Sequence, residues 1–273
     1  MMMKSNIVWR WTAMAGIVST LLLVVGFGYG VNDILNPQGM ELSVDTSTPK
    51  QPPATSDFAA KTSIQVASIG DSLTRGTGDP SGEGYVRKVV KQLSVKLDKP
   101  VKLLNNLGIN GLRADQLVHK LDEQGFKNAI TEADLILLTI GGNDIFNSAL
   151  DGDFTSQSFE LDTLLDKVDE SSKDLKKILL QIDELNPNAK IVYIGLYNPL
   201  ADIQSMRQIG DTVVQRWNNL AAATINKHPN MTLVPTADLF QAALPSYISS
   251  DHFHPNALGY EQIAYRVIQG LAP

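Results

Sequence analysis

From residue 64 to the end of the chain, apolar runs of strand length alternate with segments in which apolar residues recur every three or four positions. The runs predict strands at 64–69, 101–106, 135–140, 191–196 and 232–234. The periodic segments predict helices at 85–97, 114–121, 159–185, 212–227 and 257–269. Strands that are apolar on both faces need a covering layer on each side, so the alternation indicates a parallel sheet between two layers of helices.

The fold that this pattern predicts is a single three-layer α/β/α sandwich with a five-stranded parallel sheet, formed by residues 64–273. No internal repeat divides it. Ligands of such sheets bind outside the carboxyl ends of the strands. The loops that leave the strands are therefore where a functional site is expected.

Three of these loops carry a serine, a glycine or an asparagine soon after a predicted strand. Ser72 follows the first predicted strand, but a serine hydroxyl is a nucleophile only where a base takes its proton, and it otherwise caps a turn. Gly108 follows the second strand, where a residue without Cβ lets a main-chain N–H approach a ligand. Asn143 follows the third strand and offers a carboxamide donor or a turn cap. The α/β-hydrolase elbow is disfavoured, because Thr74 stands where that motif needs glycine.

The loop before the last helix supplies an acid and a base. Asp251 and His254 are three positions apart, so one turn of chain can bring both side chains to one face. A carboxylate bound to one imidazole nitrogen fixes the tautomer and leaves the other nitrogen basic. Of the four histidines, His119 and His228 are explained most simply as structural residues. We expect the serine, glycine and asparagine of the other loops to converge with the Asp–His pair at one edge of the sheet.

The same residues lie in four sequence blocks of a known family. The blocks are GDSLT at 70–74, NLG at 106–108, GGND at 141–144 and DHFHPN at 251–256. In this order and spacing they resemble the SGNH, or GDSL-type, hydrolases over residues 64 to 270. The resemblance implies the flavodoxin-like fold of that family and hydrolysis of carboxylic esters, as in its membrane-anchored bacterial lipase/acylhydrolase-like members.

The resemblance also implies a role for each candidate residue. Ser72 is expected to be the nucleophile, His254 its base and Asp251 the acid that orients the base. The main-chain N–H groups of Ser72 and Gly108 and the Asn143 carboxamide are expected to form the oxyanion hole. Two-step ester hydrolysis by these groups needs no metal and no organic cofactor.

The second block departs from the family pattern. A glycine and a small hydroxyl residue often continue this block in the family, whereas Leu112 and Arg113 follow Gly111 here. We expect the difference to alter the pocket floor or a substrate contact and to leave the chemistry unchanged.

The first 35 residues predict a membrane segment. Nothing charged occurs between Arg10 and Asp33, and a helix over residues 11–32 would be about 33 Å long, enough to cross a bilayer core of about 30 Å. Lys4 and Arg10 before the segment place the N-terminus inside and the remainder outside. A cleaved signal peptide is the alternative, but its apolar region would be shorter and would end in small residues. We expect an uncleaved anchor of a single-pass cell-membrane protein whose catalytic domain is extracytoplasmic.

The segment after this predicted anchor has the composition of a tether. Prolines, serines and threonines fill residues 36–63, without an apolar period. A coil of this length spans roughly 30 Å. The predicted organisation is therefore an anchor at 1–35, a Pro/Ser/Thr-rich linker at 36–63 and a hydrolase domain at 64–273.

Composition excludes several function classes and partners. The chain has no cysteine, which excludes a thiol nucleophile, disulfides and thiolate metal sites. A net charge of −6 at pH 7, without a block of lysine and arginine, argues against a nucleic-acid partner. The expected partners are an ester substrate, which is a small molecule, a lipid or a glycan, and the membrane through the N-terminal helix.

Three alternatives to a lipase-like esterase stay open. One is a metal hydrolase whose ligands would be two histidines and two aspartates, namely His252, His254, Asp251 and Asp71. No further histidine or carboxylate cluster joins these four residues. Another is a deacetylase of O-acetylated envelope glycans on the same scaffold, because a fold does not determine a substrate. The third is a catalytically silent domain that binds the cell envelope.

Overall fold

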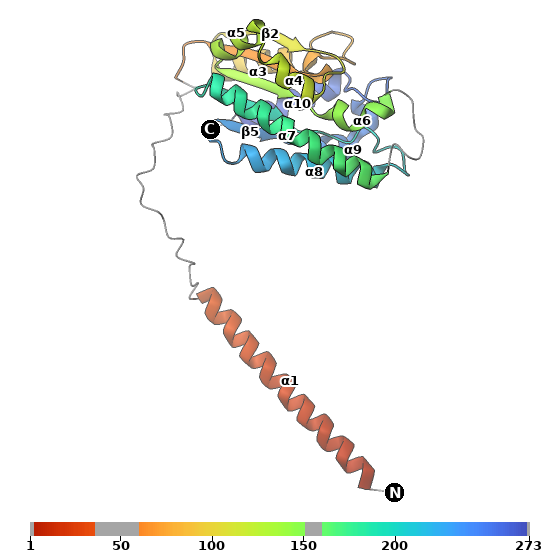
Figure 1. Cartoon of the computed structure of the whole chain (residues 1–273). Coiled ribbons are helices and arrows are strands. Elements are labelled where there is room, and N and C mark those ends of the chain that lie inside the picture. Colours follow the sequence, from red (N-terminus) through yellow and green to blue (C-terminus); the bar gives the residue numbers. More distant parts are fainter. Residues whose placement is uncertain (1–2, 36–59, 151–159, 272–273) are drawn as a thin grey trace. The chain divides into compact units, whose positions relative to one another are not determined.

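The computed structural model describes residues 3–35, 60–150 and 160–271. The chain forms two compact units, residues 1–50 and 51–273. In the first unit α1 (Met3–Leu35) is one continuous helix (Figure 1). Its stretch Trp9–Tyr29 is long and apolar enough to cross a membrane, and no other helix of the described residues is. Most of the predicted linker, residues 36–59, lies outside the described residues, so the predicted domain boundaries stay predictions.

The second unit is built on one parallel sheet with the strand order β2-β1-β3-β4-β5, so the predicted five-stranded sheet is confirmed. The strands are β1 (Ile64–Gly70), β2 (Val101–Gly108), β3 (Leu135–Thr139), β4 (Lys190–Ile194) and β5 (Met231–Val234). Both faces of β3 and nearly all of β1 are buried, which explains their unbroken apolar runs. The strand order reverses between β1 and β3, and the carboxyl ends of these two strands are the expected ligand site.

Helices cover both faces of this sheet, which confirms the three-layer sandwich (Figure 1). One face is covered by α4 (Ala114–Lys120), α5 (Gln124–Glu132), α6 (Gly142–Leu150), α7 (Leu161–Leu185) and α8 (Arg207–Ile225). The other is covered by α2 (Ser72–Arg75), α3 (Gly84–Leu97), α9 (Ala237–Tyr247) and α10 (Ala257–Gly270). Successive side chains of a strand point to opposite faces. Ile69 of β1 and Leu138 of β3 accordingly join the first core, and Val66 and Leu137 join the second.

The structure adds four helices that the apolar period does not indicate, namely α2, α5, α6 and α9. A period needs several turns to become visible, and α2 has a single turn. In α9 the period is broken, because Pro245 lies inside the helix and Ala243 has non-helical backbone angles. Also, α8 begins at Arg207, before the predicted start at residue 212.

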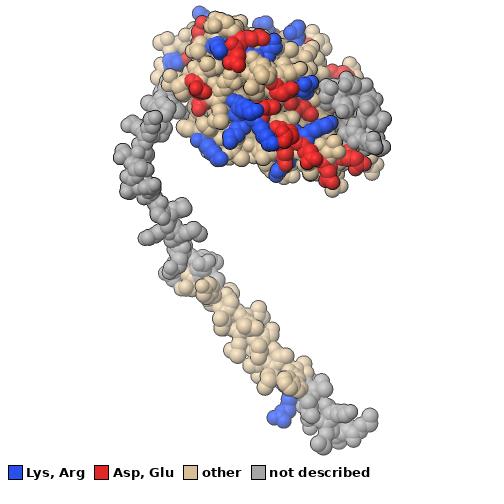
Figure 2. Space-filling view, in the orientation of Figure 1, with Lys and Arg blue, Asp and Glu red and all other residues tan. Residues whose placement is uncertain are grey.

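Acidic and basic side chains are mixed on the face formed by α7 and α8 (Figure 2). Three ion pairs lie on these helices: Arg216 with Asp169 at 2.9 Å, Lys173 with Glu170 at 2.6 Å and Lys177 with Asp174 at 2.7 Å. Exposed pairs of this kind contribute little to stability, because solvent and salt screen their charges. By pairing opposite charges, they keep the described part of this face from carrying a large excess of positive or negative charge.

Candidate active site

β1 ends in a tight turn that presents Ser72 at the edge of the sheet. Gly70 has a φ of 143°, and a Cβ at this position would lie 1.9 Å from the Thr139 carbonyl oxygen, so only glycine fits. Asp71 then caps α2, its carboxylate accepting from the Leu73 N–H at 3.0 Å. Ser72 is the first residue of α2, and Asp71 alone separates it from the end of β1.

Ser72, His254 and Asp251 form one hydrogen-bonded chain. Ser72 Oγ lies 2.9 Å from His254 Nε2, and His254 Nδ1 lies 2.7 Å from Asp251 Oδ2. An ionised carboxylate can only accept, so Nδ1 carries the hydrogen of this contact. In the neutral imidazole Nε2 is then the basic nitrogen, and the Ser72 hydroxyl donates to it.

Asp251 is kept ionised by donors of its own loop. Burial by itself would raise the pKa of this carboxyl, but hydrogen bonds from Ser249 Oγ at 2.7 Å and from the main-chain N–H groups of His254 and Phe253, both at 2.9 Å, lower the pKa to about 2. The carboxylate is therefore negative at neutral pH, which agrees with the tautomer assigned to His254. Ser249 is absent from the predicted site. Its signal is the spacing Ser-x-Asp, in which a hydroxyl two positions earlier can reach the carboxylate.

A buried polar network lies beneath the candidate nucleophile. Asp71 accepts from Thr139 Oγ1 at 2.7 Å, and Thr139 Oγ1 lies 2.7 Å from Thr74 Oγ1. Thr74 Oγ1 in turn lies 3.2 Å from the Tyr85 hydroxyl. Burial raises the pKa of Asp71 above its ordinary value. The network joins β3, α2 and α3 around the residue before Ser72, and none of its three hydroxyl groups belongs to the predicted site.

Gly108 lies where β2 passes close to α2. It pairs with Gly70 in the β1–β2 ladder, and a Cβ on Gly108 would come within 2.4 Å of the Arg75 main-chain nitrogen. Its N–H donates to Asn106 Oδ1 at 3.0 Å. Glycine is thus required here for packing, and its N–H is engaged by a neighbouring side chain.

Asn143 and the residue after it clamp α6 to the loop that follows β2. The buried Asn143 carboxamide donates one hydrogen to the Leu112 main-chain oxygen at 2.9 Å; the same nitrogen carries a second hydrogen. Both Asp144 oxygens accept from the Ala114 N–H at 3.1 Å, and burial raises the pKa of Asp144 to about 6. Leu112, a departure from the family pattern, contributes this main-chain acceptor and buries its side chain in the core.

A small apolar pocket adjoins these residues. Its walls include the residues next to the candidate nucleophile, base and carboxamide donor, namely Leu73, Phe253 and Gly142. Phe146 and Leu196 add apolar surface. Its volume of about 20 Å³ holds little more than one water molecule.

The remaining histidine of this loop stands apart from the hydrogen-bonded chain. His252 is exposed and has a left-handed backbone conformation with a φ of 57°. Within the described residues, no three His, Asp or Glu side chains gather in a metal-binding arrangement. A hydroxyl hydrogen-bonded to an imidazole, which an ionised carboxylate orients, is equipped for nucleophilic acyl transfer.

A comparison with protein families covers this same segment. The sequence model of the GDSL-like lipase/acylhydrolase family matches residues 68–262, which include Ser72, Gly108, Asn143, Asp251 and His254. The chain belongs to this family. This GDSL hydrolase is therefore an enzyme that acts on carboxylic esters.

Individual proteins and solved structures are similar to this chain. The GDSL hydrolase is 39% identical to the uncharacterized protein YpmR of Bacillus subtilis strain 168, over 77% of this chain and 82% of that protein. It is similar to the structure of the lipase Lip_vut3 from a goat rumen metagenome, with a TM-score of 0.66 and 23% identity over 76% of this chain and 97% of that one. It is also similar to the acetylxylan esterase Axe2 of Geobacillus stearothermophilus, with a TM-score of 0.56 and 21% identity over 77% and 94% of the two chains. At these identities the two structures support the fold.

Proposed function

We propose that Ser72, His254 and Asp251 hydrolyse esters in two steps through an acyl-enzyme. Ser72 Oγ attacks the acyl carbon while its proton passes to His254 Nε2, and Asp251 stabilises the imidazolium. The bond from the acyl carbon to the alcohol oxygen then breaks, and the alcohol takes the proton from Nε2. Water attacks the acyl-enzyme by the same route and releases the acid and Ser72. The observation that carries the proposal is the hydrogen-bonded chain of 2.9 and 2.7 Å through the imidazole.

The tetrahedral intermediate carries a negative charge that needs N–H donors. The Ser72 N–H is the first of α2 and has no acceptor within the helix. The second hydrogen of the Asn143 carboxamide is the other donor. The Gly108 N–H joins them when its hydrogen is shared between Asn106 Oδ1 and the oxyanion in a three-centre bond.

The acyl group enters the apolar pocket beside Ser72 in this proposal, and the pocket volume of about 20 Å³ favours a short one. An acetyl methyl group needs little more space than a water molecule, whereas a long chain has to displace Phe146 or Leu196.

The small size of this pocket, together with the likeness to an acetylxylan esterase, favours a deacetylase of O-acetylated glycans as the second candidate function. p-Nitrophenyl esters of increasing chain length, run beside an acetylated glycan, distinguish the two candidates. A rate that rises with acyl length would favour the lipase-like activity.

A pair of histidine variants tests the catalytic assignment. His254→Ala removes the base and should lower turnover by about 10⁴-fold or more. His252→Ala is the matched control, because His252 lies in the same loop and is exposed; it should leave turnover nearly unchanged. Equal losses in the two variants would contradict the role of His254. A catalytically silent binding domain would show no hydrolysis even in the wild-type chain.

We further infer that α1 anchors the enzyme in the cell membrane, with the residues after Asp33 outside the cytoplasm. Trp9–Tyr29 is long and apolar enough to span a bilayer, and its large apolar side chains are exposed. Lys4 and Arg10 precede this stretch, and positive charge stays on the cytoplasmic side. A cleaved signal peptide is the competing explanation of the same helix.

A further inference from the structure

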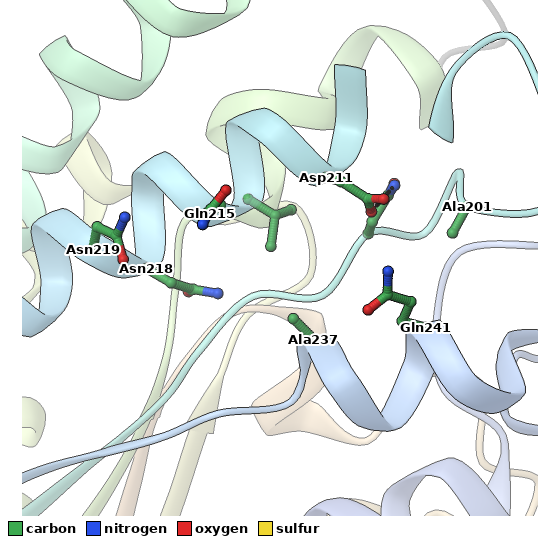
Figure 3. A pocket seen from close by; sticks show the side chains of 9 residues that line it. Ala201, Asp211, Gln215, Asn218, Asn219, Ala237 and Gln241 are labelled. Carbon is green, nitrogen blue, oxygen red and sulfur yellow. Dashed lines mark hydrogen bonds between the residues drawn. The ribbon is translucent and has the colours of Figure 1, made fainter. Parts of the chain in front are cut away.

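A second pocket lies between α8 and α9, apart from the one beside Ser72 (Figure 3). Its lining residues come after β4 and β5 in the chain. They belong to the two helices and to the segment after β4. Its volume is about 350 Å³, within the range of roughly 300–1,000 Å³ that ligand pockets occupy. No residue lines both pockets among the described residues.

Carboxamide side chains dominate the lining of this second pocket: Asn198, Gln215, Asn218, Asn219 and Gln241. A carboxamide both donates and accepts hydrogen bonds, as a hydroxyl group does. Asp211 is the one charged residue of the described lining, and it repels anions while accepting from hydroxyl groups. The apolar lining residues are the small side chains Ala201, Val214 and Ala237, which offer no deep surface for a hydrocarbon chain.

Two of the carboxamides form a fixed floor. The buried Asn198 donates to the Arg207 main-chain oxygen at 3.0 Å and to Asp211 Oδ1 at 2.8 Å. Asn218 is bonded to the N–H and the carbonyl oxygen of Leu196, both at 2.9 Å. These contacts hold the segment after β4 against α8, so the pocket keeps its shape without a ligand.

The other three carboxamides have their hydrogen-bonding groups available. Gln215, Asn219 and Gln241 are exposed, and no side-chain hydrogen bond within the described chain engages them. Gln215 and Asn219 are four positions apart on α8 and so share one face of it. Gln241 comes from α9, on the other side of the space (Figure 3). Two walls thus present donors and acceptors across a preformed gap.

We propose that this pocket binds a neutral sugar unit through its hydroxyl groups. Hydroxyls match carboxamides because each group donates and accepts, and a neutral ring meets no repulsion from Asp211. The site does not depend on ester hydrolysis. It shares with the pocket beside Ser72 only the segment after β4, which presents Asn198 to one pocket and Leu196 to the other.

The test is a binding titration of the full-length protein in a detergent without a sugar headgroup. Cellobiose and N-acetylglucosamine are the probes, and their binding is measured by calorimetry and saturation-transfer NMR. Glucuronate, which carries a negative charge, is the control. We expect saturable binding of a neutral sugar with a Kd of about 1 mM and weaker binding of glucuronate. Gln241→Leu and Gln215→Leu keep side-chain size but remove the polar groups, and each should weaken binding about 5-fold.

Two control variants locate the site. Gln208→Leu changes an exposed glutamine of α8 outside the pocket lining and should leave the Kd unchanged. Ser72→Ala should also bind the sugar with unchanged affinity, because the two pockets share no lining residue. The proposal is overturned if neither sugar binds, if the Gln215 and Gln241 double variant binds like wild type, or if Ser72→Ala abolishes binding.

Discussion

At the scale of single residues, the Asn143 carboxamide has two tasks, one in the fold and one in the proposed chemistry. Asn143→Ala should lower kcat by about 10²–10³-fold with little change in KM, because the oxyanion exists only in and near the transition state. The lost bond to the Leu112 oxygen should cost about 1 kcal/mol of stability, which thermal unfolding measures separately. A folded variant with near wild-type kcat would remove Asn143 from the site.

Asp144 should make the stability of the hydrolase pH-dependent. Burial raises its pKa from 3.8 to about 6, so between these pH values the folded chain holds a proton that the unfolded chain has released. The contribution of Asp144 to the free energy of unfolding therefore falls as pH rises from about 4 to 6, by about 3 kcal/mol. Asp144→Asn removes the titration and keeps one acceptor for the Ala114 N–H. Unfolding midpoints of both proteins across this range should diverge, and parallel curves would contradict the explanation.

The sequence predicts the residues of the hydrogen-bonded chain through His254 better than the residues that surround this chain. Ser72, Asp251 and His254 are predictable because acyl transfer restricts the residue types and the strand order restricts their places. Thr139 has no such signal, because any hydroxyl near a carboxylate can bond it and only the folded contact selects one. The Ser-x-Asp spacing makes the contact of Ser249 with Asp251 possible but does not require it. The bond between the Gly108 N–H and Asn106 is hidden for the same reason.

At the scale of elements, the loop between α2 and α3 supports the loop that carries His254. Gly78 has a φ of 92°, and a Cβ there would lie 2.6 Å from the Pro255 oxygen and 2.8 Å from His254 Cβ. Gly78→Ala should therefore shift the imidazole, and a displacement of about 1 Å costs about 10²-fold in rate. Gly82→Ala is the matched control, with a φ of 68° but no atom within 4 Å. It should share the backbone strain and keep kcat, and equal kcat losses would contradict the contact argument.

The strands are the elements that the sequence predicts best, since burial on both faces leaves continuous apolar runs such as β3. The prediction of helices fails where a local turn or cap, and not an amphipathic pattern, starts the helix. α2 begins because Asp71 caps it after a glycine turn, and α6 begins at Gly142 next to the clamp to the loop after β2. Neither of these local causes produces an apolar period in the sequence.

At the scale of the whole molecule, the N-terminal helix should decide where the enzyme is found. We expect the full-length chain in the membrane fraction, resistant to high salt and released by detergent, because its apolar side chains bury into lipid. A chain that begins at residue 60 should be soluble and hydrolyse a soluble ester with the same kcat, since both cores lie after that residue. Mature protein that begins beyond residue 25 and is free of membranes would favour a cleaved signal instead.

Mass spectrometry after reaction with a fluorophosphonate tests whether Ser72 is the nucleophile of a serine hydrolase. The reagent mimics the tetrahedral intermediate and forms a stable bond only with an activated serine. We predict one adduct per chain, on the peptide that contains Ser72, with loss of ester hydrolysis in proportion to labelling. His254→Ala should label far more slowly. An unlabelled Ser72 in fully active protein, or complete inactivation by an adduct on another residue, would contradict the account.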